Sequence, residues 1–341
     1  MVSARDLVRW LASADLGAPD GHCLSWWNPD HRGYAYPEIS GLLLRLLSLA
    51  EAAADRRQGL RRALLRDGEA GGAVHRGAQG YTFDTAMALA GLLAQMRADA
   101  EGGGGVAGRV AHGWASVLIT AAGRADPTAG QHDPGRPGRP GRPAADTRWS
   151  MAFGAHQAKV CGALLDTGRA LGPLPGLDDA ISACAGAALD VQEDDGRFRI
   201  HAASPMTYAH GHCYAVEGLL MCAAAGRTGH LRQAEAGAAW LASAQQPDGS
   251  LLAWHDGHAA SGPPRADATA QALRIWTLTG PDRFAGPAAR ARGFLAGLWA
   301  PPRGLRYEPG SGDLNAWATI FAAQALAWHA DPSAADAARI V

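Results

Sequence analysis

The sequence predicts an all-α protein in which six pairs of helices, each with an outer and an inner member, close into a ring. Three observations predict this fold. Six segments rich in Ala, Leu and Gly open with a polar or aromatic cluster, amphipathic segments alternate with them, and short Gly turns recur between the two. A closed ring of stacked pairs buries every inner helix without an exposed end. We therefore expect one domain over residues 1–341.

The inner helices are predicted from segments that are apolar nearly all round. Their openings lie at residues 37, 84, 149, 212, 267 and 315, at intervals of 47 to 65 residues. Segments such as 86–96 and 215–225 carry so few polar residues that they must be buried on all sides. Each interval has room for one helical hairpin and a loop.

The outer helices are predicted from segments with one polar face. In 60–66, 106–122, 231–244 and 288–298, apolar residues alternate with polar ones at helical spacing. These four are examples of the segments between inner helices, and the N-terminal segment 4–14 adds a further outer helix. Twelve helices in six outer-inner pairs follow.

Short Gly turns recur between an outer helix and the next inner helix. They are Asp20-Gly21, Asp67-Gly68, Asp195-Gly196, Asp248-Gly249 and Arg303-Gly304, each followed by a short aromatic or aliphatic stretch. Such sequences favour β-hairpins, which should gather at the mouth where the inner helices begin. The third unit instead carries a Pro/Gly/Arg-rich insertion at 126–147, predicted to be a flexible loop.

Two sequence patterns resemble known families. Gln192 to Phe198 and Gln245 to Gly249 share a Gln-x-x-Asp-Gly turn, and with the six hairpins they resemble the (α/α)6 toroids. These include the squalene-cyclase and prenyltransferase repeat families and several carbohydrate-active enzymes. The six residues from Tyr36 to Gly41 are similar to the opening of the C-terminal domain of glucuronyl C5-epimerases. The first resemblance covers nearly the whole chain and implies the toroid fold.

Composition excludes several classes of protein. The 341 residues are 48% hydrophobic and carry a net charge of −1, which gives no general attraction to nucleic acid or anionic membrane. Charged or Gly residues interrupt every apolar run before it could span a bilayer. Five cysteines without a C-x-x-C pair favour reduced thiols, and the charged residues of the first helix argue against a secretion signal. We expect a cytoplasmic protein with a small-molecule substrate.

The first turns of the inner helices should converge on a central funnel, which is the expected binding site. The candidate catalytic residues are ionisable: His212, His210, Glu38, Asp84 and Asp267. The candidate substrate-binding residues are mostly aromatic: Trp26, Trp27, Tyr36, Phe83, Trp149, Tyr214, Trp254, Tyr307, Asn315 and Trp317. Aromatic rings stack on sugar faces while carboxylates and imidazoles bond hydroxyl groups.

Each candidate also has a structural interpretation. His210 and His212 form the strongest acid/base pair, because imidazole titrates near neutral pH, but they could lie in a polar turn. Asp84, Asp267 and Asn315 occupy positions typical of helix N-caps. Glu38, which follows Pro37, could simply interact with the positive end of the helix dipole, and the Trp residues could pack in the core. Lys159, in an otherwise apolar helix, needs a charged partner or water.

Several chemistries lack their signatures. His210-x-His212 beside Cys213 could ligate zinc, but no paired Cys/His spacing accompanies it, so we expect neither metal nor cofactor. No Gly-rich phosphate loop is present, and Glu193-Asp194-Asp195 belongs to an Asp-Gly turn instead of an Asp-x-Asp-Asp acid of terpene cyclases.

The sequence thus predicts an acid/base enzyme that acts in the funnel on a sugar- or uronate-like substrate by epimerisation, elimination or hydrolysis. One alternative is an intramolecular ring-closing enzyme of specialised metabolism, with a carboxylate or imidazole base. Another is a non-catalytic toroid that binds a small molecule or a partner. A small partner subunit over the funnel, or a homo-oligomer, stays open.

Overall fold

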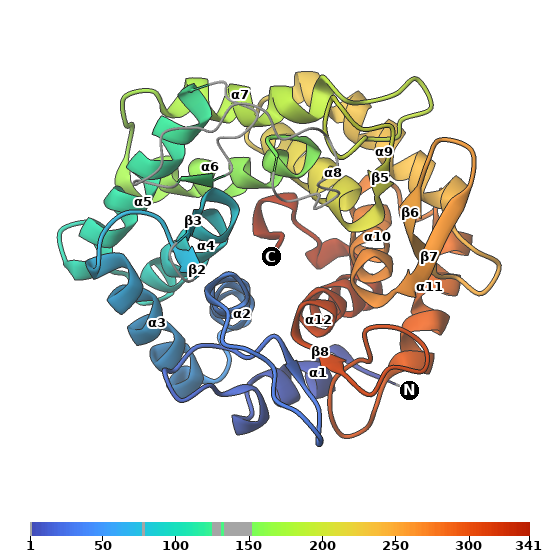
Figure 1. Cartoon of the computed structure of the whole chain (residues 1–341), viewed down its shortest axis with the longest axis horizontal. Helices are drawn as coiled ribbons and strands as arrows, with labels where there is room; N and C mark the ends of the chain where they lie inside the picture. The colour runs from blue at the N-terminus through green and yellow to red at the C-terminus, as the bar shows by residue number, and fades with distance from the viewer. Residues whose placement is uncertain (1, 77–78, 125–130, 133–151) are drawn as a thin grey trace.

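The computed structural model describes residues 2–76, 79–124, 131–132 and 152–341. Within these ranges, twelve α-helices alternate between the outer and inner layers of a ring (Figure 1). The expected all-helical toroid is confirmed.

The inner layer consists of helices that are buried on nearly all sides. They are α2 (Pro37–Leu49), α4 (Thr82–Ala98), α6 (Val160–Leu171), α8 (Ala209–Ala224), α10 (Ala266–Thr279) and α12 (Ala316–Ala330). α4 is buried without interruption from Thr82 to Met96. α2 and α4 pack closely at Gly41 and Gly91, where a Cβ on either residue would lie 2.3 Å from backbone of the other helix. The apolar sequence of these helices is therefore explained by their position.

The outer helices bury one face and expose the other. They are α1 (Ala4–Leu11), α3 (Ala54–Glu69), α5 (Val106–Gly123), α7 (Leu177–Leu189), α9 (Leu231–Ala244) and α11 (Ala285–Leu298). In α3, for example, Leu60, Ala63 and Leu64 are buried. α1 packs against α12, and α12 packs against α2, which closes the ring between the two ends of the chain.

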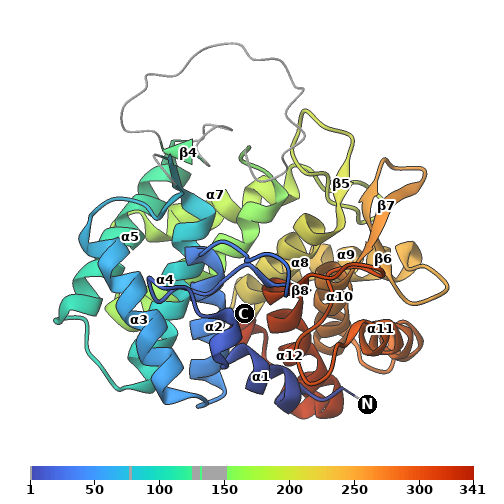
Figure 2. The ribbon, with the colours of Figure 1, turned by 60° about the horizontal axis from the view of Figure 1, so that its bottom comes forward.

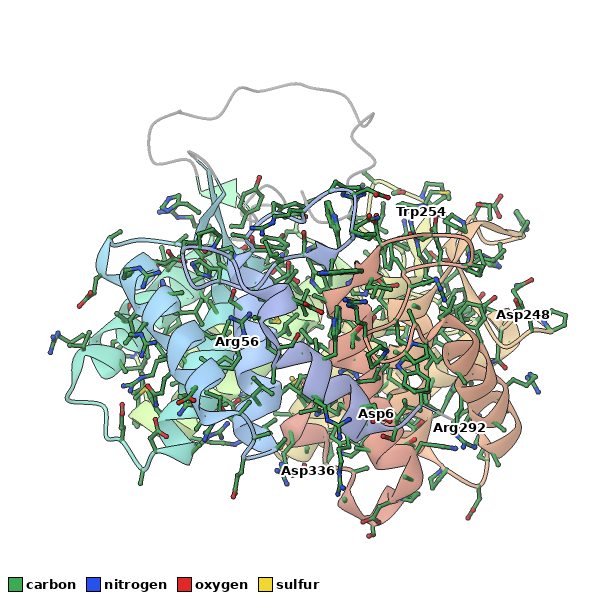
Figure 3. All side chains as sticks on the ribbon, turned by 90° about the horizontal axis from the view of Figure 1, so that it is seen from below. Asp6, Arg56, Asp248, Trp254, Arg292 and Asp336 are labelled. Atoms are coloured by element: carbon green, nitrogen blue, oxygen red, sulfur yellow. The ribbon has the colours of Figure 1, made fainter. Side chains whose placement is uncertain are left out.

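Short strands gather at one end of the ring, which we call the mouth (Figure 2). β1 (Trp26–Trp27) pairs with β8 (Leu314–Asn315), while β2 (His75–Arg76), β3 (Gln79–Tyr81) and β4 (Gln131–His132) form a second sheet. β5 (Thr207–Tyr208), β6 (Leu251–His255) and β7 (Ala260–Arg265) form the third. Figure 3 places Trp254 of β6 at this end, and Asp6 and Asp336 toward the other.

Three of the predicted Asp-Gly turns are confirmed. Asp20, Asp195 and Asp248 each accept a hydrogen bond from the backbone N–H two residues on. The glycines that follow them have φ values of +87°, +92° and +91°, which favour Gly. The prediction for Asp67-Gly68 is wrong: α3 continues to Glu69, and the chain turns at Gly71 and Gly72, with φ of +89° and +77°.

The third inner helix begins later than predicted. Its expected opening around Trp149 lies outside the described residues, and the chain enters the inner layer through the 3-10 helix η3 (Ala155–Lys159) before α6. Of the insertion predicted at 126–147, the structure describes only β4, which pairs with β3 through His132 and Gly80.

The last described segment enters the ring, which the sequence did not indicate. Residues 332–341 run toward the centre (Figure 1), where Ile340 and Val341 are fully buried. Arg45 Nε donates to the Ile340 carbonyl at 2.8 Å, and Gln324 Nε2 donates to that of Arg339 at 2.8 Å. Both side chains lie about two turns from the starts of their helices, so this segment lies below the mouth.

The remaining composition-based expectations concern cysteines and membranes. All five cysteines are buried free thiols, as expected. In the part of the chain that the structure describes, no helix has both the length and the apolar character needed to cross a bilayer.

Candidate active site

Five ionisable side chains from five parts of the inner layer meet at the mouth. Glu38 and Asp84 lie in the first turns of α2 and α4, His156 lies in η3, and His210 and Asp267 are the second residues of α8 and α10. We call them the mouth cluster. Each is only 1 to 6% exposed, so their electrostatic interactions are weakly screened.

One side of the mouth cluster is tied together by aromatic residues. Trp317 Nε1 donates to Glu38 Oε1 at 3.1 Å, and the Tyr36 hydroxyl donates to Asp84 Oδ1 at 3.5 Å. The rings of Tyr36 and Trp317 meet edge to face, with centroids 5.2 Å apart. The Glu38 and Asp84 carboxylates thus lie beside an aromatic wall formed by Tyr36, at the start of α2, and Trp317 of α12.

The other side centres on His210. Its Nδ1 lies 2.6 Å from Gln271 Oε1 and 3.4 Å from Asp267 Oδ2. Both partners are hydrogen-bond acceptors, so we assign the proton of the neutral ring to Nδ1 and the basic lone pair to Nε2. The imidazole can therefore accept a proton through Nε2 while Asp267 stabilises the resulting cation.

The orientation of Gln271 is set from below. Its Nε2 donates to Glu217 Oε1 at 3.3 Å, which directs Oε1 toward His210. Glu217 is fully buried and also accepts from Lys159 Nζ at 2.9 Å and from Arg274 Nε at 2.7 Å. Burial lowers the pKa of Lys159 to about 7, although Glu217 opposes this shift. Lys159 thus has the charged partner that its sequence context requires.

Asp267 is held as an acceptor beside His210. Its Oδ2 accepts from the Tyr307 hydroxyl at 3.1 Å, and its Oδ1 accepts from the Ala268 N–H at 2.8 Å. Burial, with the Asp267 charge, raises the pKa of Tyr307 well above its usual range, so the phenol stays a donor. The Arg265 guanidinium lies 4.4 Å from the Tyr307 ring centroid.

Tyr214 connects the two sides. Its ring lies 4.3 Å from His210 and 4.9 Å from Phe83, whose ring lies 5.5 Å from His156. Burial, followed by the charge of Glu38, raises the pKa of Tyr214 well above its usual range. Tyr214 therefore keeps its proton at neutral pH and lies within electrostatic reach of Glu38, a residue of the opposite side.

His212 does not join the mouth cluster, contrary to its predicted pairing with His210. Its Nδ1 accepts from the Phe198 N–H at 3.1 Å, and its Nε2 donates to the Gly237 carbonyl at 3.1 Å. Residues two apart on a helix point in nearly opposite directions, so the side chains cannot share one site. Burial lowers the pKa of His212 to about 3, so the ring is neutral near pH 7. Its two hydrogen bonds connect Phe198, in the segment before α8, with Gly237 of α9.

The N-cap interpretation applies to only one of three candidates. Asn315 caps α12, because its Oδ1 accepts from the Ala318 N–H at 2.9 Å. Asp84 and Asp267 lie inside their helices, whose N-caps are Tyr81 and Arg265. Glu38 follows Pro37 in the first turn of α2, as expected.

The other aromatic candidates lie around the cluster. Trp254 packs on Tyr208 with centroids 4.7 Å apart, and Tyr208 lies 5.9 Å from His210. Trp26 contacts Tyr34, whereas Arg303 covers the ring of Trp27 at 4.0 Å, on the other side of the strand. Trp149 lies outside the described residues.

Sequence reasoning missed Gln271, Glu217 and Arg274. All three are fully buried in otherwise apolar inner helices. The argument that pointed to Lys159 would have found them, because a buried polar side chain needs a partner. A zinc site at His210, His212 and Cys213 finds no support, since no metal-binding group of three or more His, Cys, Asp or Glu side chains occurs in the described part of the chain.

Comparisons with known proteins bear on the fold. No protein-family model matches the chain, and no curated protein sequence does. Cellobiose 2-epimerase from Bacillus thermoamylovorans B4167 is similar in structure, with a TM-score of 0.74 and 10% identity over 95% of this chain and 98% of that one.

Two further solved structures match to a similar extent. A sugar epimerase from a ruminal bacterium has a TM-score of 0.71 and 11% identity over 95% and 97% of the two chains. An unsaturated glucuronyl hydrolase specific for heparin has a TM-score of 0.70 and 15% identity over 96% of each chain. Over nearly its whole length, this chain therefore has the (α/α)6-toroid fold that these enzymes share.

Proposed function

We propose that this protein is an acid/base enzyme that moves a proton on a sugar- or uronate-like small molecule at the mouth of the ring, by epimerisation or elimination. The observation that carries the proposal is the placement of His210, with Nδ1 bonded to Gln271 and beside Asp267, across Tyr214 from Glu38. Both reactions begin when a base removes a proton from carbon. An imidazole with its lone pair on Nε2 is suited to that step.

Each residue then has a distinct role. His210 Nε2 takes the proton, and Asp267 stabilises the imidazolium that forms. Tyr214, which keeps its proton, donates a hydrogen bond to the oxygen on which negative charge develops. Glu38, on the opposite side, takes up a proton from solvent and gives it to carbon in epimerisation or to the leaving group in elimination, and His210 then releases its proton to solvent. Trp317 and Phe83 supply ring faces for the sugar.

The similarity to two sugar epimerases supports this choice of substrate. The five reduced thiols are in keeping with an enzyme of the cytoplasm.

The test is isotope exchange. The protein is incubated in D2O with cellobiose, with mannobiose and with an unsaturated glucuronyl disaccharide, and deuterium on carbon is followed by NMR. We expect exchange with at least one sugar, its loss in His210→Asn, and its retention in His112→Asn, an exposed histidine on α5. If no sugar exchanges, or if His210→Asn exchanges as fast as the wild type, the proposal is wrong. Ring closure of an added amine or alcohol substrate, or binding without turnover, would then favour the alternatives.

Hydrolysis is a second candidate, favoured by a different observation. Glu38 and Asp84 both contact the aromatic wall, and two carboxylates of this kind can serve as acid and base around a glycosidic bond. The similarity to an unsaturated glucuronyl hydrolase supports the same reading. This candidate predicts release of a reducing sugar, lost in both Glu38→Gln and Asp84→Asn but not in His210→Asn.

A further inference from the structure

A concave site lies beside β1, apart from the mouth cluster. It is a pocket of about 540 Å³, a size typical of small-molecule sites. Its lining includes Trp26, Trp27, Asn28, Asp30, His31 and Arg32, and we call it the rim pocket. Because Arg303 covers the ring of Trp27, the available aromatic face is that of Trp26. An indole together with carboxylate, amide and guanidinium groups is the chemistry that binds a sugar, whose ring faces are apolar and whose edges carry hydroxyls.

The rim pocket is held in shape by its own hydrogen bonds. Trp26 Nε1 donates to His31 Nδ1 at 3.2 Å, so the His31 proton lies on Nε2, which is 3.2 Å from Asp313 Oδ1. Asn28 Nδ2 donates to the same oxygen at 2.6 Å. At Gly33, a Cβ would lie 2.5 Å from the Trp26 carbonyl oxygen, so the loop folds tightly back over β1. A site arranged in advance loses less entropy when it binds a ligand.

A continuous row of aromatic rings leads from the rim pocket to the mouth cluster. Trp26 and Tyr34 have centroids 5.2 Å apart, Tyr34 and Tyr36 5.4 Å, and Tyr36 and Trp317 5.2 Å. Trp317 in turn bonds Glu38. Tyr34 is 49% exposed, which is unusual for a large hydrophobic side chain of this protein. Each step is close to the size of one sugar ring.

We infer that the substrate is an oligosaccharide, whose reacting unit lies at the mouth cluster and whose distal units pass the exposed ring of Tyr34 into the rim pocket. This inference rests on the proposed function for the identity of the reacting end. The Asp15 carboxylate is paired with Arg303 Nε at 3.1 Å, and the lining carries one further acid, Asp30, and one further base, Arg32. Asp313, which contacts His31 and Asn28, adds a negative charge that would repel an anionic sugar. The distal units are therefore neutral sugars, not sulfated or carboxylated ones.

Binding by chain length tests the inference without turnover. Titration calorimetry is run on His210→Asn, which is expected to bind but not react, with cello-oligosaccharides from di- to hexasaccharide. Stacking on one exposed ring predicts that the longer chains bind about 3- to 10-fold more tightly than the disaccharide. Trp26→Ala, added to His210→Asn, should remove the tighter binding of the longer chains and leave the affinity for the disaccharide unchanged. Trp26→Phe should restore part of the tighter binding. The control variant Leu231→Ala, on the exposed surface of α9, should not change the affinity for any chain length.

Equal affinity for all chain lengths would overturn the inference, as would an equal loss for short and long chains in Trp26→Ala. A second variant, Arg32→Ala, guards against misfolding at β1 and should also weaken only the longer chains. A charged series, such as oligogalacturonate, that binds more tightly than the neutral one would contradict the assignment to neutral sugars. Length-dependent binding without deuterium exchange in the wild type would leave the rim pocket supported and the proposed function refuted.

Discussion

The hydrogen bonds below the mouth cluster lead to a prediction about Gln271. Replacing it with Leu keeps the side-chain size but removes the acceptor 2.6 Å from His210 Nδ1 and the donor to Glu217. Glu217 retains Lys159 and Arg274, so the buried charges stay paired. Asp267, at 3.4 Å, is then the remaining acceptor near Nδ1. The imidazole loses its shortest orienting contact.

The expected magnitude follows from the loss of one buried hydrogen-bond partner. Such a loss costs about 1–3 kcal/mol, which corresponds to a fall in kcat of about 5- to 150-fold if the whole effect falls on the orientation of His210. KM should change little, because Gln271 lies below the imidazole and is fully buried. The matched control is Gln95→Leu, a fully buried glutamine of α4 that bonds Ser48 and Asp99 instead. Both variants should lose comparable stability.

The assay is ¹⁵N NMR of the histidine side chains, with His210 assigned by its absence in His210→Asn. In the wild type and in Gln95→Leu we expect the neutral ring with its proton on Nδ1. In Gln271→Leu we expect a mixture of both tautomers, together with the fall in kcat. If Gln271→Leu keeps the wild-type tautomer and matches Gln95→Leu in kcat, Gln271 does not position His210 and the reasoning is refuted.

Three further predictions concern stability. His212→Leu should lower the free energy of unfolding by about 2–3 kcal/mol because two backbone groups lose their partner, yet leave kcat unchanged. The pKa of His212 is lowered from 6.5 to about 3 in the folded protein, so between these pH values the unfolded chain binds a proton at this residue and the folded chain does not. The free energy of unfolding of the wild type should therefore rise with pH between about 3 and 6.5, and it should rise less steeply in His212→Leu. Equal slopes in urea melts at several pH values would contradict this. Gly41→Ala should force α2 and α4 apart, lower the free energy of unfolding by about 3 kcal/mol or more and reduce activity. Gly59→Ala, where a Cβ would have no neighbour within 4 Å, should leave stability unchanged or raise it. Equal melting temperatures of the two variants would contradict the close packing of α2 against α4. Asn315→Ala should cost about 0.5–2 kcal/mol through loss of the α12 cap, measured by denaturant unfolding, and an unchanged midpoint would show that the cap contributes nothing.

Much of the fold was predictable because its signals are local. An apolar segment such as 86–96 must be buried on all sides, and an amphipathic one such as 231–244 must face water on one side. The turns at Asp195 and Asp248 depend only on their own side chain and the next glycine. Asp67-Gly68 failed because the packing of α3 overrode the local turn preference, with Gly68 lying against Val110 of α5.

The site was only partly predictable, for a physical reason. The placement of Glu38, Asp84, His210 and Asp267 at the mouth was predictable, because the starts of the inner helices meet at one end of the ring. His212 was paired with His210 because the two are close in sequence, although helical geometry separates them.

The sequence by itself determined that the chain forms helices in an outer and an inner layer, and which ends of the inner helices carry the ionisable groups. Only the tertiary structure decided which of those groups lie together, because their contacts join residues far apart in the chain: His210 meets Gln271 across 61 residues and Glu38 meets Trp317 across 279. Periodicity along a helix reports which face is buried, but it carries no information about the partner on another helix, and the arrangement of the mouth cluster depends on those partners.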